Sequence, residues 1–150
     1  MRLTSDAFED GGPIPEQYGY RAANVNPPLT IHDAPEETET LVLVVDDPDA
    51  MEPAGKVWDH WVVWNIPPET THVPADWDSS SVDAVQGRND YGEVGYGGPN
   101  PPDREHTYQF VVRALDTGLA LDRGETKAEL EMAIEGHVLD EARLTGTYAP

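Results

Sequence analysis

Three apolar stretches of the chain predict β-strands that share one core. Residues 41–45 form an uninterrupted run of leucine and valine, which is typical of a strand buried on both faces. Residues 60–67 and 106–115 alternate, as a strand does when its two faces meet different surroundings. In the second strand this alternation assigns the side chains to two faces: His60, Val62 and Trp64 on one, and Trp61, Val63 and Asn65 on the other.

The end of the chain predicts one amphipathic α-helix. Thr126 and Glu129 have the spacing of a capping box, and apolar residues follow at helical intervals, at Leu130, Ala133, Ile134 and Val138. We therefore expect a mainly β domain with an antiparallel sheet, on which this C-terminal helix packs. The length of 150 residues suits one domain, and no internal repeat or shift in composition divides it.

The charge of the chain limits its partners. Nine Lys and Arg residues against 29 Asp and Glu residues give a net charge of −20 at pH 7. Such a surface repels nucleic acid and anionic membranes at long range, so neither is an expected partner. The acids are spread over the whole chain, which is typical of the solvated shell of halophilic proteins.

Other features of the composition indicate a cytoplasmic protein. No cysteine is present, which excludes disulfides and thiolate catalysis. The N-terminus has neither the basic nor the apolar part of a secretory leader, and no apolar run has the length of a membrane span. We expect a soluble protein without integral membrane association.

Five polar side chains lie close to the ends of the predicted strands: Asp47, Asp49, His60, His106 and Tyr108. Strand ends in a small β domain can meet at one rim, so these side chains could line one pocket. Imidazole and phenol groups supply hydrogen-bond donors, and carboxylates would orient the imidazoles or hold them cationic. Residues 96–102 (YGGPNPP) add glycines whose backbone N–H groups could approach an anion. Together these groups suit an oxyanion such as phosphate.

Each feature also has an ordinary structural explanation. Aspartates around a proline form common turns, a histidine at a strand end is more often structural than functional, and a Gly-Gly pair before proline usually forms a turn. The sequence has no G-x-S-x-G, H-E-x-x-H or P-loop motif. Asp47, Asp49 and His60 are acceptable metal ligands, but no tight ligand spacing supports a metal site. No catalytic residue, metal or cofactor is therefore expected.

Several motifs follow one another along residues 8–148: FEDGGPIP, NPPL, LVLVVDDPDA, HWVVWNIP, YGGPNPP, HTYQFVVRALD and AIEGHVLDEARLTGTY. Their order resembles the phosphatidylethanolamine-binding protein family, also called the Raf kinase inhibitor protein family, and in particular its bacterial and archaeal branch. The resemblance implies a central antiparallel sheet, a second small sheet and a C-terminal α-helix. It also implies a small pocket that accepts phosphate, acetate-like anions or a phospholipid headgroup.

Matched residue by residue, the resemblance places the ligand-binding positions of the family at Asp47, Asp49, His60, Gly98, Asn100, His106 and Tyr108. Asp46, although adjacent and equally acidic, receives no role. Three positions depart from the family pattern. Met51 stands in place of a proline, Asn100 in place of a small residue such as cysteine, and Thr107 in place of an arginine. These departures bear on the shape of the rim, the fit of a headgroup and the local charge.

The first functional hypothesis is a non-enzymatic protein that binds a small anion. His60 and His106 would donate to the anion, the two aspartates would orient and charge the histidines, and Tyr108 would close one side. The second hypothesis is a regulatory protein that docks on or inhibits a protein partner such as a kinase. The third is a hydrolase that uses Asp and His as acid and base. From the family's bacterial and archaeal members, a homodimer is one expectation for the assembly.

Overall fold

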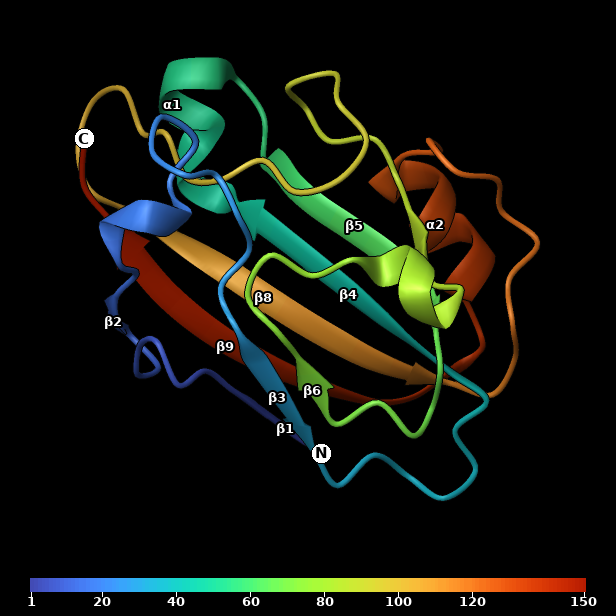
Figure 1. The fold of residues 1–150 in the computed structure, drawn as a ribbon. Coiled ribbons are helices and arrows are strands. Elements are labelled where there is room, and N and C mark those ends of the chain that lie inside the picture. Colours follow the sequence, from blue (N-terminus) through green and yellow to red (C-terminus); the bar gives the residue numbers. More distant parts are fainter.

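Two β-sheets packed face to face carry the fold (Figure 1). The computed structural model describes residues 1–150. Six strands form the larger sheet, in the spatial order β2 (Gly12–Pro13), β9 (Val138–Tyr148), β8 (His106–Leu115), β4 (Thr40–Asp47), β5 (Trp58–Ile66) and β7 (Val85–Gln86). All neighbours in this sheet run antiparallel except β2 and β9. The smaller, antiparallel sheet contains β1 (Arg2–Thr4), β3 (Leu29–His32) and β6 (His72–Val73).

The helices and helical turns of the fold are all short. The two α-helices are α1 (Met51–Ala54) and α2 (Lys127–Ile134), and the three 3-10 turns are η1 (Glu16–Tyr18), η2 (Pro48–Ala50) and η3 (Ser79–Val82). None of them has the length and apolar character that crossing a lipid bilayer would require.

The uninterrupted apolar run in β4 is explained by two separate hydrophobic clusters. Leu41, Leu43 and Val45 point toward the smaller sheet and belong to the main cluster of 20 buried residues. Val42 and Val44 point the other way, into a cluster of seven buried residues that α2 covers. The prediction of a strand buried on both faces is confirmed, as are the strands predicted at 60–67 and 106–115.

The alternation in β5 is interrupted at His60. Val45 of β4 pairs with Trp61, but the next pair is Asp46 with Asp59, so His60 is an extra residue on β5. A bulge of this kind redirects a side chain. The prediction that His60 shares a face with Val62 and Trp64 is therefore wrong. Those two pack in the cluster under α2, whereas His60 lies against Tyr108 on the opposite face, with ring centroids 5.2 Å apart.

The predicted helix exists but ends early. Its capping box forms as expected, with Thr126 as the N-cap and Glu129 as the reciprocal partner. The helix ends before Gly136, whose φ of +81° turns the chain. The assignment of Val138 to the helix is wrong, because this residue begins β9, the strand that pairs with β8 along its length. Pairing with a distant strand overrode the local helical spacing, and the last element of the fold is a strand.

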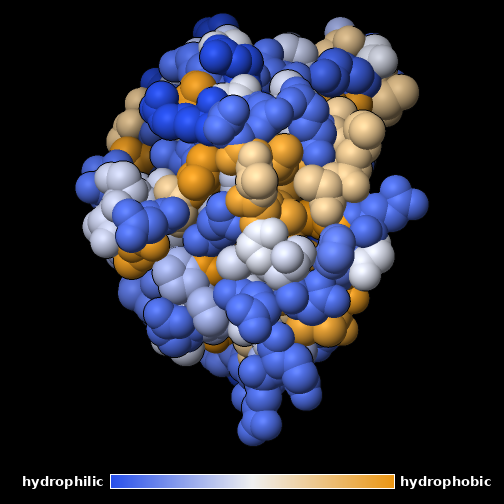
Figure 2. All heavy atoms as spheres, turned by 90° about the vertical axis from the view of Figure 1, so that its right-hand side faces the viewer, coloured by the Kyte–Doolittle hydropathy of each residue, from blue (hydrophilic) through white to orange (hydrophobic).

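The acidic residues lie outside this core. Of the 29 Asp and Glu side chains, only Asp47 is buried. Figure 2 shows the side of the molecule on which α2 lies, where hydrophilic side chains cover most of the surface around an apolar band. The burial of Asp47 is unusual, because removing an isolated charge from water is costly.

Candidate ligand-binding site

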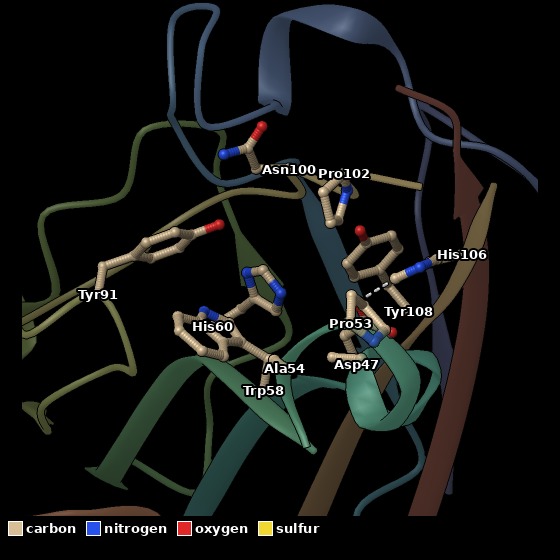
Figure 3. Close-up of a pocket in the computed structure, with 11 residues that line it drawn as sticks. Asp47, Pro53, Ala54, Trp58, His60, Tyr91, Asn100, Pro102, His106 and Tyr108 are labelled. Atoms are coloured by element: carbon tan, nitrogen blue, oxygen red, sulfur yellow. Dashed lines mark hydrogen bonds and ion pairs between the residues drawn. The ribbon is translucent and has the colours of Figure 1, made fainter. Parts of the chain in front are cut away.

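A cavity of about 250 Å³ lies where the end of β4 meets the starts of β5 and β8 (Figure 3). These strand ends adjoin because β4 runs antiparallel to both of its neighbours. The cavity is lined by eleven residues: Asp47, Ala50, Pro53, Ala54, Trp58, His60, Tyr91, Asn100, Pro102, His106 and Tyr108. Five of the seven residues predicted to bind a ligand are among them, and the other two, Asp49 and Gly98, are not.

The buried ionisable side chains of the protein converge on this cavity. Among Asp, Glu, Lys, Arg and His, only Asp47, His60 and His106 are buried, with 3%, 2% and 1% of each residue exposed. All three line the cavity. Burying a charged group is costly, so three such residues at one cavity favour a ligand-binding site there. Independent structural roles for the three side chains would not bring them together.

His106 is held between two carboxylates. Its Nδ1 donates to Asp47 Oδ2 at 2.6 Å and its Nε2 donates to Asp103 Oδ1 at 2.7 Å. Burial by itself lowers the pKa of His106, but the hydrogen bonds to Asp47 and Asp103 outweigh burial and raise the pKa above its ordinary value of 6.5. Both ring nitrogens are engaged, so the expectation that His106 donates directly to a ligand is not supported by this geometry. When protonated, His106 places a positive charge beside the cavity, held between the two carboxylates.

Opposite pKa shifts of the two buried histidines are expected in solution. His106 should titrate above 6.5 and His60 below it, because burial lowers the pKa of His60 and no carboxylate contacts its ring. Since the folded-state pKa of His106 is raised, its contribution to stability is complete below about pH 6.5 and is lost as the pH rises through the folded-state value. Ring ¹⁵N NMR titration measures both values, and urea unfolding across this pH range measures the loss.

Asp103→Asn provides the matched control for that titration. It removes one carboxylate from His106 without touching His60, so only the pKa of His106 should fall. An unchanged His106 titration in this variant would contradict the assignment of Asp103 as a partner.

The imidazole of His60 presents one nitrogen to the cavity. Its Nδ1 donates to the carbonyl oxygen of Gly97 at 2.6 Å, within the rim loop. The other nitrogen, Nε2, forms no hydrogen bond with the protein. Figure 3 shows the ring between those of Tyr91 and Tyr108, with Asn100 and Pro102 on the far side of the same space. The bulge in β5 therefore places a ring nitrogen where a ligand can reach it.

Two hydrogen-bonding groups of the cavity wall have no protein partner. The hydroxyl of Tyr108, a residue only 1% exposed, is unpaired, and so is the indole N–H of Trp58. Burial, reinforced by the charge of Asp47, raises the pKa of Tyr108, so this phenol stays protonated and can donate. An unsatisfied buried polar group costs about 1–3 kcal/mol, and a ligand oxygen would offset that cost.

The three neighbouring acids of the DDPD sequence have separate surroundings. Asp47 lines the cavity, and its Oδ1 also accepts from the backbone N–H of Asp49 at 2.9 Å. Asp49 lies outside the cavity, where its Oδ2 accepts from the backbone N–H of Thr107 at 2.8 Å. Asp46 lies on the opposite face of the sheet, 3.2 Å from Lys127 Nζ. Of these three acids, only Asp47 lies where it could interact directly with a ligand in the cavity.

Gly98 holds the rim loop in place and does not face the cavity. Its backbone N–H donates to Asn24 Oδ1 at 2.7 Å, and its carbonyl accepts from the Tyr91 hydroxyl at 2.8 Å. A Cβ at this position would lie 2.1 Å from the carbonyl oxygen of Tyr18. The prediction that Gly98 offers its N–H to a ligand is therefore not supported, because that N–H is already satisfied.

Sequence reasoning missed several parts of the site. Tyr91 lies in a long polar loop without periodicity, and Asp103 lies in a charged turn, so neither carried a recognisable signal. Trp58 also lines the cavity and lies two residues before the strand predicted at 60–67. Of the positions that depart from the family pattern, Met51 is exposed at the start of α1 and Thr107 is exposed on β8, so only Asn100 meets the cavity.

Residues 4–149 match the sequence model of the phosphatidylethanolamine-binding protein family. The chain belongs to this family. A UPF0098 protein of Methanothermobacter thermautotrophicus is 46% identical over 152 residues, spanning 99% of this chain and 98% of the relative. A UPF0098 protein of Chlamydia trachomatis is 41% identical over 150 residues, with the same two coverages of 99% and 98%. The resemblance to the bacterial and archaeal branch is confirmed.

Solved structures agree with this family membership. The crystal structure of a putative phosphatidylethanolamine-binding protein homologue from Chlamydia trachomatis superimposes with a TM-score of 0.91 at 41% identity, covering 98% of this chain and 95% of the other. The Escherichia coli protein YbcL, presented as a new member of the mammalian family, gives a TM-score of 0.88 at 34% identity, covering 98% and 96%. The predicted fold class, mainly β with two sheets, is confirmed.

Proposed function

We propose that this family member is a non-enzymatic protein that binds a small oxyanion in the cavity between His60 and Tyr108. The observation that carries the proposal is the buried Tyr108 hydroxyl, which has no partner and belongs to a residue that lines the cavity. A ligand oxygen would accept from this hydroxyl and from the Trp58 indole. Phosphate, a phosphate ester and a carboxylate all offer such oxygens.

The surroundings of these donors support binding of a small group. Pro53, Ala54 and Trp58 contribute apolar surface on one side, and a site that excludes water strengthens each hydrogen bond inside it. The positive charge of His106 partly balances Asp47. Because these groups act at short range, the net charge of −20 on the whole chain does not exclude an anion at high salt, where the Debye length is about 3 Å at 1 M.

The proposal of a binding protein, and not an enzyme, rests on the chemistry of the lining. No serine, threonine, cysteine or lysine lines the cavity. Asp47 is the one carboxylate there, and its two oxygens accept from His106 and from the backbone of Asp49. No group of three or more Asp, Glu or His side chains has the arrangement of a metal site. No feature of the structure favours the hydrolytic or the partner-docking hypothesis over binding.

Titration with inorganic phosphate tests the proposal. Saturable shifts are expected for the ring nitrogens of His60 and for the indole N–H of Trp58 in ¹⁵N NMR spectra. His60→Ala should weaken binding about tenfold or more, since it removes one polar partner of a charged ligand. His137→Ala is the matched control, because His137 is exposed and pairs with Asp116 away from the cavity. Equal binding by the two variants would contradict the proposal.

A further inference from the structure

Apart from the amide of Asn100, which can both donate and accept, the polar atoms of the residues that line the cavity are an unequal set of donors and acceptors. Two donors are free, the Tyr108 hydroxyl and the Trp58 indole N–H. The Tyr91 hydroxyl already donates to the Gly98 carbonyl, and both nitrogens of His106 already donate to carboxylates. A ligand therefore meets at least two groups that require an acceptor.

His60 adds one group that requires a donor. Because Nδ1 donates to the Gly97 carbonyl, the neutral ring carries its proton there, and Nε2 is left with a lone pair. This nitrogen has no protein partner. A fully deprotonated oxyanion would satisfy Tyr108 and Trp58 but would bring an oxygen lone pair against the lone pair of Nε2. Such a contact is repulsive unless a proton lies between the two atoms.

The groups around His60 cannot readily provide that proton. On β4, Asp46 and Asp47 are carboxylates. Tyr91 of the loop and Tyr108 of β8 are phenols whose pKa is raised by burial. His106 of β8 keeps its two protons in hydrogen bonds to Asp47 and Asp103. The neighbouring charges of Asp46 and Asp47 favour a cationic His60, but burial has the larger effect and lowers its pKa.

Charge leads to the same conclusion. The unit formed by Asp47, His106 and Asp103 contains two carboxylates and one imidazolium, so it carries one uncompensated negative charge. A dianion beside it is more strongly repelled than a monoanion. Both the hydrogen-bond inventory and the local charge therefore favour a ligand that has kept a proton.

We infer that the cavity binds its oxyanion together with one proton, located between a ligand oxygen and His60 Nε2. The preferred ligands are then inorganic phosphate and phosphate monoesters, which carry an acidic O–H. Sulfate, which has the same shape but no such proton, and phosphate diesters, which have none either, bind less well. This inference rests on the proposed function and specifies the ligand class for the same site.

The pH dependence of binding follows from the proton. The second pKa of a phosphate monoester is about 6, so below this pH the ligand arrives as the monoanion with its proton. Above it, the dianion of the monoester predominates and has no O–H, so each complex must take up one proton from solution. The affinity for a monoester should therefore fall as the pH rises, by about tenfold for each pH unit above the pKa of the ligand. The dianion of inorganic phosphate still carries one O–H, so its affinity should fall less.

Isothermal titration calorimetry with four probes tests the inference on the unmodified protein. At about pH 5, inorganic phosphate is expected to bind at least about tenfold more tightly than sulfate, and methyl phosphate more tightly than dimethyl phosphate. The stronger of phosphate and methyl phosphate identifies the free anion or the monoester as the better ligand. At about pH 8, titrations in buffers of different ionisation enthalpy should show uptake of about one proton per methyl phosphate bound, against about none at pH 5.

Two kinds of failure are distinguishable. If none of the four probes binds at either pH, the proposed function itself is wrong. If phosphate and sulfate bind equally and binding of methyl phosphate takes up no proton at pH 8, the cavity is an anion site and the inference about the proton is overturned. His60→Gln provides a further readout, because its amide N–H can donate where Nε2 accepts, and it should reduce the preference for phosphate over sulfate. Retention of the full preference in this variant would also overturn the inference.

Discussion

Replacing Asp47 by alanine is expected to destabilise the protein by about 3–5 kcal/mol, the range measured when one partner of a buried ion pair is removed. The carboxylate is 3% exposed and accepts from His106 Nδ1 at 2.6 Å. As the N-cap of the turn η2, it also accepts from the backbone N–H of Asp49 at 2.9 Å. The variant would leave a buried imidazolium with Asp103 as its one carboxylate partner and an unsatisfied N–H beside it. Urea unfolding near neutral pH measures the difference.

Asp46→Ala is the matched control for this prediction. It removes the adjacent acid, whose partner Lys127 keeps a second ion pair with Asp59 at 2.6 Å. Because a partly exposed pair contributes little, we expect a loss of less than about 1 kcal/mol. Phosphate binding should persist in Asp46→Ala, because Asp46 pairs with Lys127 and does not line the cavity. Equal destabilisation by the two substitutions would contradict the structural distinction between the neighbouring acids.

Gly98→Ala is expected to destabilise the protein by about 1–3 kcal/mol and to displace the rim loop, as overpacking does in a closely packed region. The added Cβ would lie 2.1 Å from the carbonyl oxygen of Tyr18 and 2.8 Å from the carbonyl carbon of Gly19. These are backbone atoms, which cannot rotate away. The same loop carries Asn100 and the Gly97 carbonyl that orients His60, so binding of phosphate should weaken together with stability.

Gly118→Ala tests whether any added methyl group has this effect. A Cβ there would have its nearest neighbours at 3.9 Å, in Asn65 and Thr40, so we expect a change within about 0.5 kcal/mol and unaltered binding. Thermal unfolding and phosphate titration of both variants measure the two effects. A Gly98→Ala protein as stable as Gly118→Ala would show that the loop is not seated against residues 18–20.

The strands could be predicted because their signal is local. The apolar run of β4 and the alternation of β8 follow from which faces of each strand are buried, and the capping box of α2 lies within four residues. The extent of that helix could not be predicted in the same way. Val138 also fits helical spacing, and its strand conformation depends on pairing with β8, more than twenty residues earlier in the chain.

The sequence by itself determined which chemical groups stand at the strand ends, because the apolar pattern stops after Val45, before Asp46 and Asp47, and begins again near His60 and His106. Only the tertiary structure decided how they are used. The bulge that turns His60 toward Tyr108 arises from the register between β4 and β5. The second carboxylate on His106 and the close approach at Gly98 arise from loops that fold back on the site. Periodicity reports the burial of one segment, whereas ring orientation and hydrogen-bond partners depend on contacts between segments that no local pattern encodes.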